Sequence, residues 1–337
     1  MKILLFSDSK KLFRKSGVGV ALSHQIQALK KNGVSYTLNP SDSYDLAHIN
    51  TVGPGAMRVL RKSKKIGVPV IYHCHTTEED FRNSFIFSNL FAPFLKNHLI
   101  RLYSKADYLL FPSKYTEKII KSYNINKPGK VISNGVDTTI FLKDIEKAKQ
   151  FRKYFNIEKN RKLFISVGLP FKRKGIRDFV EIAKKIPDAV FFWFGAKITS
   201  ILPREISKII KYSPNNVYFP GYVKFEKLIG AYSAANAFLF PSYEENEGIV
   251  ILEALSTSNP VIVRDIPVFK DWLKHEYNCL KCNSVDSFRL ALKRICEDKL
   301  LAEELSKNAR KTALEKDLLF IGKQLKNVYL EVLENRL

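Results

Sequence analysis

Short apolar segments alternate with helical segments along almost the whole chain, and this alternation constrains the fold more than any other feature. Two series of strand-like runs follow one another: "KILLFSD", "DLAHIN", "VPVIYHCH", "ADYLLFPS" and "KVISNG", and then "KLFISVG", "AVFFWFG", "NVYFPGY", "AFLFPS" and "PVIVRD". Sequences with helical periodicity, such as "GVGVALSHQIQALKKNG" and "GIRDFVEIAKKI", lie between the runs. Because strands buried on both faces read as continuous apolar runs, the pattern predicts two α/β domains, each a parallel sheet covered by helices.

A highly charged segment at 143–161 separates the two series of strands. The length of 337 residues also exceeds the usual size of one hydrophobic core, which favours two domains. We therefore expect doubly wound domains at residues 1–145 and 146–320. The amphipathic segment 321–337 is expected to form a helix that packs back on the first domain.

The formal net charge of +23 requires an anionic partner or surface, unless it reflects only a lysine-rich solvated exterior. Nucleic acid, anionic lipid and phosphorylated substrates all satisfy that requirement. Four cysteines are present, and the pair Cys279-x-x-Cys282 lacks a second pair, so we interpret the cysteines as reduced packing residues. No run of about 18 apolar residues occurs, and the N-terminus is charged too early for a signal peptide, which favours a cytoplasmic protein.

Ligands of open parallel sheets bind beyond the carboxyl ends of the strands, so the residues at these positions are the candidate site residues. In the first domain they include Gly17 and Gly19 of the loop at 16–19, which suit the approach of a phosphate to a helix N-terminus or form a simple flexible turn. His75 follows a later strand and is either a site residue or a structural histidine. In the second domain Gly168 is followed by "LPFKRKG", where Arg173 and Lys174 suit a diphosphate or belong to a solvated loop.

The stretch "PSYEENEGIVILEAL" resembles the Pro-Ser-x-x-Glu-x-x-Gly…Glu-Ala signature of the retaining glycosyltransferases of family 4, with the Glu-x7-Glu pair at Glu245 and Glu253. Other matches occur in the expected order: the glycine loop at 16–19, His75, "SNGVD" at 133–137, Lys174-Gly175 and "PGYV" at 220–223. The resemblance covers almost the whole chain. It implies the GT-B fold, in which two Rossmann-like domains face a cleft.

The resemblance also implies roles for individual residues. Glu245 would hold the donor sugar and Glu253 the ribose, because sugar hydroxyls donate strong hydrogen bonds to carboxylates. Arg173 and Lys174 would neutralise the leaving diphosphate. The implied catalytic residues are His75, Arg173, Lys174 and Glu245, and the implied donor-binding residues are Gly17, Gly19, Gly168, Arg173, Lys174, Tyr222, Glu245, Gly248, Ile249, Val250 and Glu253.

The chain departs from the family pattern at Leu169, where many members have arginine, so Arg173 is expected to supply that guanidinium. The sequence contains no recognisable set of metal ligands. We therefore predict a UDP-sugar as donor substrate and no bound metal or cofactor, and leave open a requirement for added magnesium.

A run rich in phenylalanine follows His75 and bears on the acceptor. It contains Phe81, Phe85, Phe87, Phe91 and Phe94, with the cations Arg82 and Lys96 among or just after them. These rings do not fit one helical stripe, so the run is either a buried helix or a segment with one apolar face on the domain and one on an anionic membrane.

This region also resembles a branch of family 4 that adds a second hexose to monoglucosyl-diacylglycerol on the inner face of bacterial membranes. We therefore expect a peripheral membrane enzyme that uses UDP-glucose first and UDP-galactose second. A polysaccharide acceptor is the nearer alternative. A basic nucleic-acid-binding protein is the remote one, because it leaves the glutamate pair without a purpose. The sequence does not indicate the oligomeric state.

Overall fold

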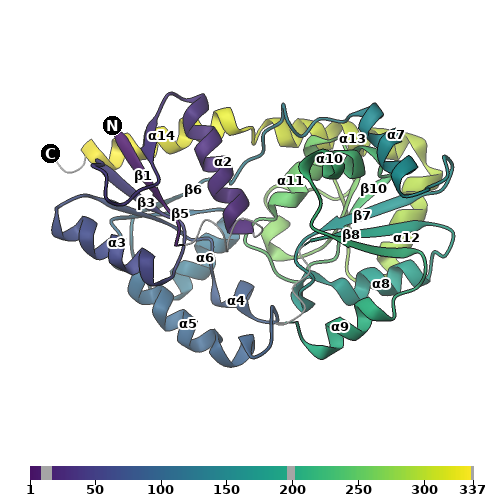
Figure 1. Ribbon diagram of the computed structural model, residues 1–337, viewed down its shortest axis with the longest axis horizontal. Helices are drawn as coiled ribbons and strands as arrows, with labels where there is room; N and C mark the ends of the chain where they lie inside the picture. The colour runs from purple at the N-terminus through teal and green to yellow at the C-terminus, as the bar shows by residue number, and fades with distance from the viewer. Residues whose placement is uncertain (9–16, 196–201, 335–337) are drawn as a thin grey trace. The chain divides into compact units, whose positions relative to one another are not determined.

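The computed structural model describes residues 1–8, 17–195 and 202–334, and the chain divides into two compact units (Figure 1). The first unit comprises Met1–Phe81, Asn89–Gly135 and Lys316–Leu337, and the second comprises Arg82–Ser88 and Val136–Glu315. Each unit contains a six-stranded sheet in which every pairing is parallel. The predicted pair of doubly wound domains is therefore confirmed.

In the first unit the strands run in the order β2-β1-β3-β4-β5-β6. They are β1 (Lys2–Phe6), β2 (Ser35–Thr37), β3 (Leu46–Ile49), β4 (Val70–His73), β5 (Tyr108–Phe111) and β6 (Gly129–Val131). The helices are α2 (Gly17–Lys31), α3 (Pro54–Lys65), α4 (Glu78–Phe81), α5 (Ser88–Tyr103), α6 (Lys114–Ser122) and α14 (Leu318–Glu334).

Two separate apolar layers cover the faces of the first sheet. Helices α3, α5 and α6 pack on one face through residues such as Val59, Leu99 and Ile120. Helices α2 and α14 pack on the other face, where Leu29 and Leu325 belong to one buried cluster. The C-terminal helix thus packs back on the first unit, as the sequence predicted.

In the second unit the order is β12-β11-β10-β7-β8-β9. The strands are β7 (Leu163–Val167), β8 (Val190–Phe194), β9 (Val217–Gly221), β10 (Ala237–Phe240), β11 (Val261–Arg264) and β12 (Leu280–Cys282). The helices are α7 (Ile145–Tyr154), α8 (Ile176–Lys184), α9 (Arg204–Lys211), α10 (Phe225–Ala234), α11 (Ile249–Ser256), α12 (Val285–Glu297) and α13 (Lys299–Leu314), with short 3-10 helices η1 (Lys172–Lys174) and η2 (Pro267–Phe269).

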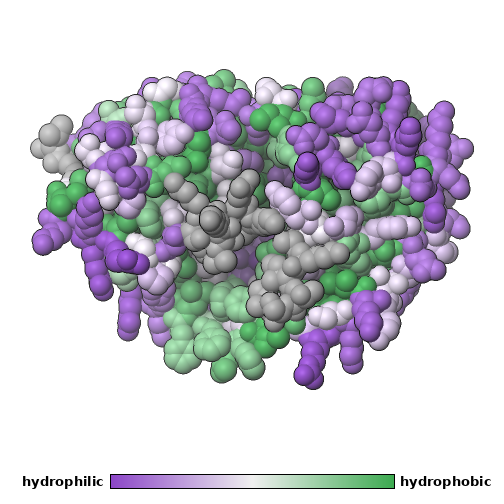
Figure 2. All heavy atoms as spheres, in the orientation of Figure 1, coloured by the Kyte–Doolittle hydropathy of each residue, from purple (hydrophilic) through white to green (hydrophobic). Residues whose placement is uncertain are grey.

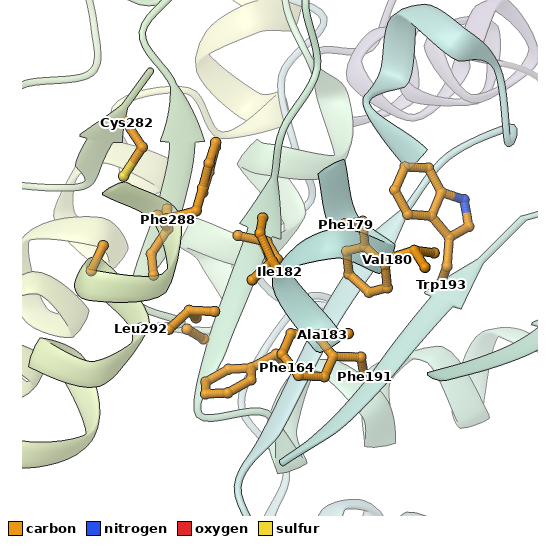
Figure 3. Close-up of a cluster of buried hydrophobic side chains, with 14 of the residues drawn as sticks. Phe164, Phe179, Val180, Ile182, Ala183, Phe191, Trp193, Cys282, Phe288 and Leu292 are labelled. Atoms are coloured by element: carbon orange, nitrogen blue, oxygen red, sulfur yellow. The ribbon is translucent and has the colours of Figure 1, made fainter. Parts of the chain in front are cut away.

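The core beneath α8 and α12 is rich in aromatic rings (Figure 3). Phe179 of α8 packs edge-to-face on Trp193 of β8, with ring centres 5.2 Å apart. Phe288 of α12 is fully buried in the same cluster. This layer fixes the sheet on which the second unit carries its candidate site.

The strand order reverses between β7 and β10 in the second sheet, and between β1 and β3 in the first. At such a switch point the connections leave the two neighbouring strands toward opposite faces of the sheet and open a crevice for ligands. The segments that follow β7 and β10, and those that follow β1 and β3, are therefore the positions where the fold itself favours a site.

The boundary between the units lies at Gly135/Val136, earlier than the predicted boundary at 145/146. The reason is that residues 136–144 are tied to the second unit. Ser256 Oγ donates to the Phe141 carbonyl (2.6 Å), and Arg310 Nη2 donates to the Thr138 carbonyl (3.0 Å). At the C-terminal end the chain rejoins the first unit at Lys316, slightly before the predicted start of the last segment at 321.

Candidate active site

The loop that follows β7 approaches the loop that follows β10 through a glycine. The short helix η1 is capped by Gly175, which has a φ of 75°. A Cβ atom at this position would lie 2.2 Å from the Pro241 carbonyl oxygen, so a side chain has no room here. The left-handed conformation and the close approach both favour glycine. Together they bring Lys174 beside the glutamate-rich loop.

Lys174 and Glu245 form an ion pair in which the ammonium contacts Oε1 of the carboxylate. Ser242 Oγ donates to the same oxygen at 2.7 Å. The side chains of Lys174 and Glu245 are only 16% and 7% exposed, so water screens their attraction weakly. The structure thus brings together two of the predicted catalytic residues, at the switch point of the second sheet.

Arg173 is buried and braces the glutamate-rich loop. Its Nε donates to Ser84 Oγ at 2.8 Å, and its Nη1 donates to the Glu244 carbonyl at 3.0 Å. The Arg173 carbonyl accepts from the Tyr243 amide at 2.7 Å. These contacts hold the loop and the segment Arg82–Ser88 together, a positioning function that the sequence did not predict.

A second buried arginine fixes the other side of the same loop, and sequence reasoning missed it. Arg264 pairs with Asp178, and its Nε donates to the Pro241 carbonyl at 3.1 Å. The Tyr243 hydroxyl donates to Asp178 at 2.7 Å, while the Tyr243 ring lies 3.9 Å from the Arg264 guanidinium. The loop that presents Glu245 is therefore held by arginines from two directions.

Glu253 lies in helix α11, which begins after Gly248. Gly248 has a φ of 92°, so the chain turns sharply into the helix, and Ile249 and Val250 form its first turn. The Tyr232 hydroxyl donates to Glu253 Oε2 at 2.8 Å. Burial nevertheless raises the pKa of Glu253 to about 7, because the charged form loses hydration. Glu253 is thus a carboxyl group that titrates near neutral pH beside a helix N-terminus that favours anions.

The remaining predicted donor residues of the second unit also follow strand ends. Gly168 follows β7, and its carbonyl accepts from the Trp193 indole at 2.9 Å. Tyr222 follows β9 and is 59% exposed. Both positions lie at the carboxyl edge of the sheet, where this class of fold binds its ligands.

The predicted site residues of the first unit lie near the switch point of its own sheet. Gly17 and Gly19 begin helix α2 after β1, and Ser16 of the predicted loop lies outside the described residues. His75 follows β4, and its Nε2 lies 3.0 Å from Asn50 Oδ1. Burial lowers the pKa of His75 to about 3, so the imidazole is neutral at physiological pH.

The phenylalanine-rich run is divided between the interior and the surface. Phe81 and Phe85 are half-buried, whereas Phe87, Phe91 and Phe94 are 68%, 52% and 70% exposed. Figure 2 shows hydrophobic side chains at the lower edge of the view, where α5 lies in Figure 1. A fully buried helix is therefore wrong for this run.

The two predicted cations of this run have different surroundings. Arg82 is half-buried. Lys96 pairs with Glu78 at 3.4 Å, and its ammonium lies 4.7 Å from the centre of the Tyr123 ring. Lys96 was expected among the cations that face a membrane, but these partners hold its charge against α4. The exposed cation of helix α5 is Arg101.

Residues 1–8, 17–195 and 202–334 contain no group of three or more His, Cys, Asp or Glu side chains suited to a metal ion. Within the same residues, no helix has both the length and the apolar character needed to cross a bilayer. Cys74, Cys279 and Cys282 are buried, and burial raises the pKa of each thiol, consistent with packing.

Comparison with solved structures identifies the fold of the chain. The structure of the Anabaena protein Alr3699/HepE in complex with UDP-glucose matches 98% of this chain and 100% of that chain, with a TM-score of 0.80 at 17% sequence identity. The two parallel six-stranded sheets with their helices define the GT-B fold.

The family follows from the sequence comparisons. Residues 27–140 match the model of "Glycosyltransferase Family 4", and residues 147–312 match that of "Glycosyl transferases group 1". The chain belongs to glycosyltransferase family 4. It is 41% identical to the processive diacylglycerol alpha-glucosyltransferase of Acholeplasma laidlawii, over 99% of both chains. It is also 25% identical to the alpha-galactosylglucosyldiacylglycerol synthase of Streptococcus pneumoniae, over 82% of this chain and 76% of that protein.

Proposed function

We propose that this protein transfers glucose from UDP-glucose to glucosyl-diacylglycerol, with retention of configuration, and so makes a diglucosyl membrane lipid. The observation that carries the proposal is the 41% identity to a diacylglycerol glucosyltransferase over 99% of both chains. The site of the second unit supports it, because Lys174 and Glu245 meet at the switch point where a nucleotide-sugar donor is expected to bind.

The second unit offers a complementary group for each part of the donor. The Glu253 carboxylate accepts hydroxyl protons of the ribose, and Glu245 accepts those of the hexose. The N-terminus of α11, with Ile249 and Val250 in its first turn, faces the diphosphate. In the reaction the bond from the anomeric carbon to the diphosphate oxygen breaks, and a bond to the acceptor oxygen forms. The acceptor hydroxyl loses its proton, and UDP leaves.

Lys174 contributes most where charge develops. Negative charge accumulates on the diphosphate as the glycosidic bond breaks, and a preoriented ammonium in a poorly hydrated site stabilises that charge strongly. The ion pair with Glu245 fixes the ammonium before the donor arrives. Ser242 and the two buried arginines hold Glu245 and its loop, so the charges need little rearrangement during the reaction.

The outer surface of α3 and α5 supports a lipid acceptor. At 100° per residue, Leu90, Phe94 and Arg101 of α5 lie within about 40° of one another, so one exposed stripe changes from apolar to cationic along the helix. Helix α3 packs on the same face of the sheet and contributes Arg58, Arg61, Lys62 and Lys65, together with Lys64, which pairs with Asp107. Neither helix contains an Asp or Glu residue. Such a surface suits the anionic headgroups of a membrane that presents the acceptor.

The decisive experiment is incubation of the purified protein with radiolabelled UDP-glucose and glucosyl-diacylglycerol in mixed micelles that contain an anionic lipid. We expect a labelled diglucosyl lipid whose new linkage is cleaved by an α-glucosidase and resists a β-glucosidase. Parallel reactions with diacylglycerol alone and with a soluble glucan test the acceptor. Transfer only to the glucan would overturn the lipid assignment.

Galactose is the second candidate for the transferred sugar. It is supported by the relative named as an alpha-galactosylglucosyldiacylglycerol synthase. Glucose and galactose differ at one hydroxyl group, so the same assay with labelled UDP-galactose separates them. We expect a higher kcat/KM with UDP-glucose, and the reverse order would replace the donor while leaving the acceptor unchanged.

A further inference from the structure

A buried polar network lies behind His75 in the first unit. His48 belongs to β3 and His73 to β4, and the three imidazoles stack in sequence. Ring centres are 5.4 Å apart between His48 and His73, and 3.9 Å apart between His73 and His75. Gln25 of α2 and Asn50 after β3 complete the network, and both are buried. Polar side chains from three separate elements therefore converge on one residue of the proposed catalytic set.

The hydrogen bonds of the network indicate which ring nitrogen of His75 carries the proton. Gln25 Nε2 donates to Asn50 Oδ1 at 2.7 Å, so this oxygen acts as an acceptor. The same oxygen lies 3.0 Å from His75 Nε2, and an amide oxygen has no proton to give. With the Asn50 and Gln25 amides in this orientation, the proton of this bond belongs to His75 Nε2.

The alternation of hydrogen-bond donors and acceptors continues through His73, His48 and Tyr329. Gln25 Nε2 contacts His73 Nδ1 at 3.0 Å, and His48 Nε2 contacts it at 3.3 Å. His48 Nδ1 lies 2.7 Å from the Tyr329 hydroxyl of α14. With the Tyr329 hydroxyl donating to His48 Nδ1, the donors Gln25 Nε2 and His48 Nε2 share the one lone pair of His73 Nδ1, and every imidazole is neutral.

The network lowers the stability of the fold, which a purely structural role does not explain. Among the described residues, Gln25 Oε1, Asn50 Nδ2 and His73 Nε2 are buried without a hydrogen-bond partner. Buried polar atoms without partners destabilise a fold, and apolar side chains of similar size would avoid that loss. The arrangement is explained if it serves the site rather than the core.

We propose that Asn50 is a positioning residue of the transfer reaction: its Oδ1 accepts from His75 Nε2 and so holds the imidazole in one orientation and one neutral tautomer. This inference rests on the proposed function only for the identity of the substrate. Burial also lowers the pKa of His75 to about 3 and that of His48 to about 3. The pKa of His73 is lowered too, by burial and by both neighbouring histidines, so the stack stays neutral throughout the working pH range.

Asn50→Asp tests the assignment, because it keeps an acceptor oxygen and adds a negative charge beside His75. An adjacent carboxylate stabilises the imidazolium and raises the pKa of His75 toward neutrality. The imidazolium replaces the neutral tautomer that Asn50 is proposed to hold, so kcat of this variant should fall about tenfold or more between pH 8.5 and pH 6. With donor and acceptor saturating, the wild-type kcat should change little over the same interval. Asn50→Ala should lower kcat with less effect on the KM for UDP-glucose.

Asn32→Asp is the matched control. Asn32 lies in the same unit outside the network, and its Nδ2 donates to the carbonyls of Ala28 and Leu319. This variant loses stability through those bonds, yet its pH profile should match that of the wild type. An Asn50→Asp profile that superimposes on the wild-type profile, or an Asn50→Ala enzyme with unchanged kcat, would overturn the proposal.

Nuclear magnetic resonance of ¹⁵N-histidine-labelled wild-type protein gives a readout that needs neither a folded variant nor a lipid acceptor. We expect a neutral His75 with the proton on Nε2 at pH 7, with the resonance assigned by its loss in His75→Gln. A proton on Nδ1, or an imidazolium, would refute the role of Asn50. If the tautomer is as expected but no glucosyl lipid forms, the proposed acceptor is wrong while the positioning of His75 stands.

Discussion

Each unit contains a six-stranded parallel sheet, but the carboxyl edges of the two sheets carry different kinds of side chain. The second unit concentrates charges there and holds them with ion pairs, namely Lys174 with Glu245 and Arg264 with Asp178. The first unit places buried, neutral imidazoles and amides at the corresponding edge, and the Asp8 carboxylate there accepts hydrogen bonds from Thr51 and from the amides of Gly53 and Ala56. An anionic nucleotide needs oriented charge, whereas a sugar hydroxyl needs only a neutral donor or acceptor. The difference teaches that the carboxyl edge of one kind of sheet can carry either paired charges or a buried network of neutral groups.

The largest test of the paired charges in the second unit is removal of a cation. Lys174→Ala should reduce kcat roughly 10²–10³-fold, because a preoriented charge at the leaving group is lost. Steady-state kinetics and thermal melting should be measured together, since Glu245 loses its partner. Lys172→Ala is the control: it removes a cation from the same short helix, but one that is mostly exposed and paired with Glu205. Normal turnover in a folded Lys174→Ala protein would remove Lys174 from the site.

The second test uses the protonation of Glu253. Its pKa of about 7 lies above the ordinary carboxyl value, so the free protein carries a neutral carboxyl group below pH 7 and a carboxylate above it. Binding that requires the carboxylate should weaken about tenfold per pH unit below 7. Titration calorimetry with UDP-glucose between pH 5 and 8 should show this decline. UDP-glucose is the suitable ligand because its diphosphate is a diester and has no titration in this range.

Glu253→Gln separates this carboxyl group from other titrating groups. The variant should bind UDP-glucose more weakly at pH 8 and with little dependence on pH. If the wild-type affinity is already flat from pH 5 to 8, Glu253 does not act as a carboxylate toward the ribose, and the contrast between the two units is weaker than we infer.

The third test concerns the exposed rings of the first unit. Phe91→Ser combined with Phe94→Ser should lower the affinity for anionic vesicles by roughly tenfold or more, because two apolar side chains no longer insert. The melting temperature should change little, since both rings are already exposed. Phe320→Ser on α14 removes another exposed ring, outside this surface, and serves as the control. Equal sedimentation of the double variant and the wild type with anionic vesicles would contradict the proposal that α5 contacts the membrane.

The smallest expected effect comes from a single surface cation. Arg61→Gln on α3 should weaken binding to anionic vesicles about fivefold, since one cation near such a surface contributes about 1 kcal/mol. Increasing salt should reduce the difference between variant and wild type. Lys323→Gln, on α14 at the opposite face of the same sheet, should have no effect. An equal loss in both variants would mean that net charge alone, and no particular face, governs vesicle binding.

The architecture could be predicted because its signal is local. Each strand of the two sheets is a short apolar run, and the helices between them show helical periodicity. The predicted break at 145/146 was late because the ties that draw residues 136–144 to the second unit involve Ser256 and Arg310, far along the chain. No local pattern reports such contacts.

The site was predictable only in part, for the same reason. Glu245 and Glu253 stand out through their spacing and their place after a strand, and the family resemblance gives them roles. The contact of Arg173 with Ser84 and the pairing of Arg264 with Asp178 join residues 89 and 86 positions apart, so nothing in the neighbouring sequence announces them. The imidazole stack also depends on how β3 and β4 align, which the sequence leaves unspecified until the sheet is formed.

Helix α14 is translated after the second unit but belongs to the first, so the order of synthesis affects folding. The chain crosses between the units at 81/82, 88/89, 135/136 and 315/316, so neither unit is one continuous stretch. Until Leu318–Glu334 has left the ribosome, one face of the first sheet lacks Leu325 and Val328, and His48 lacks the Tyr329 hydroxyl. The domain that is translated first is therefore completed last. A nascent chain must therefore carry an incomplete first core while the second unit is made, and a chain truncated before Leu318 lacks both the α14 cover and the Tyr329 end of the histidine network.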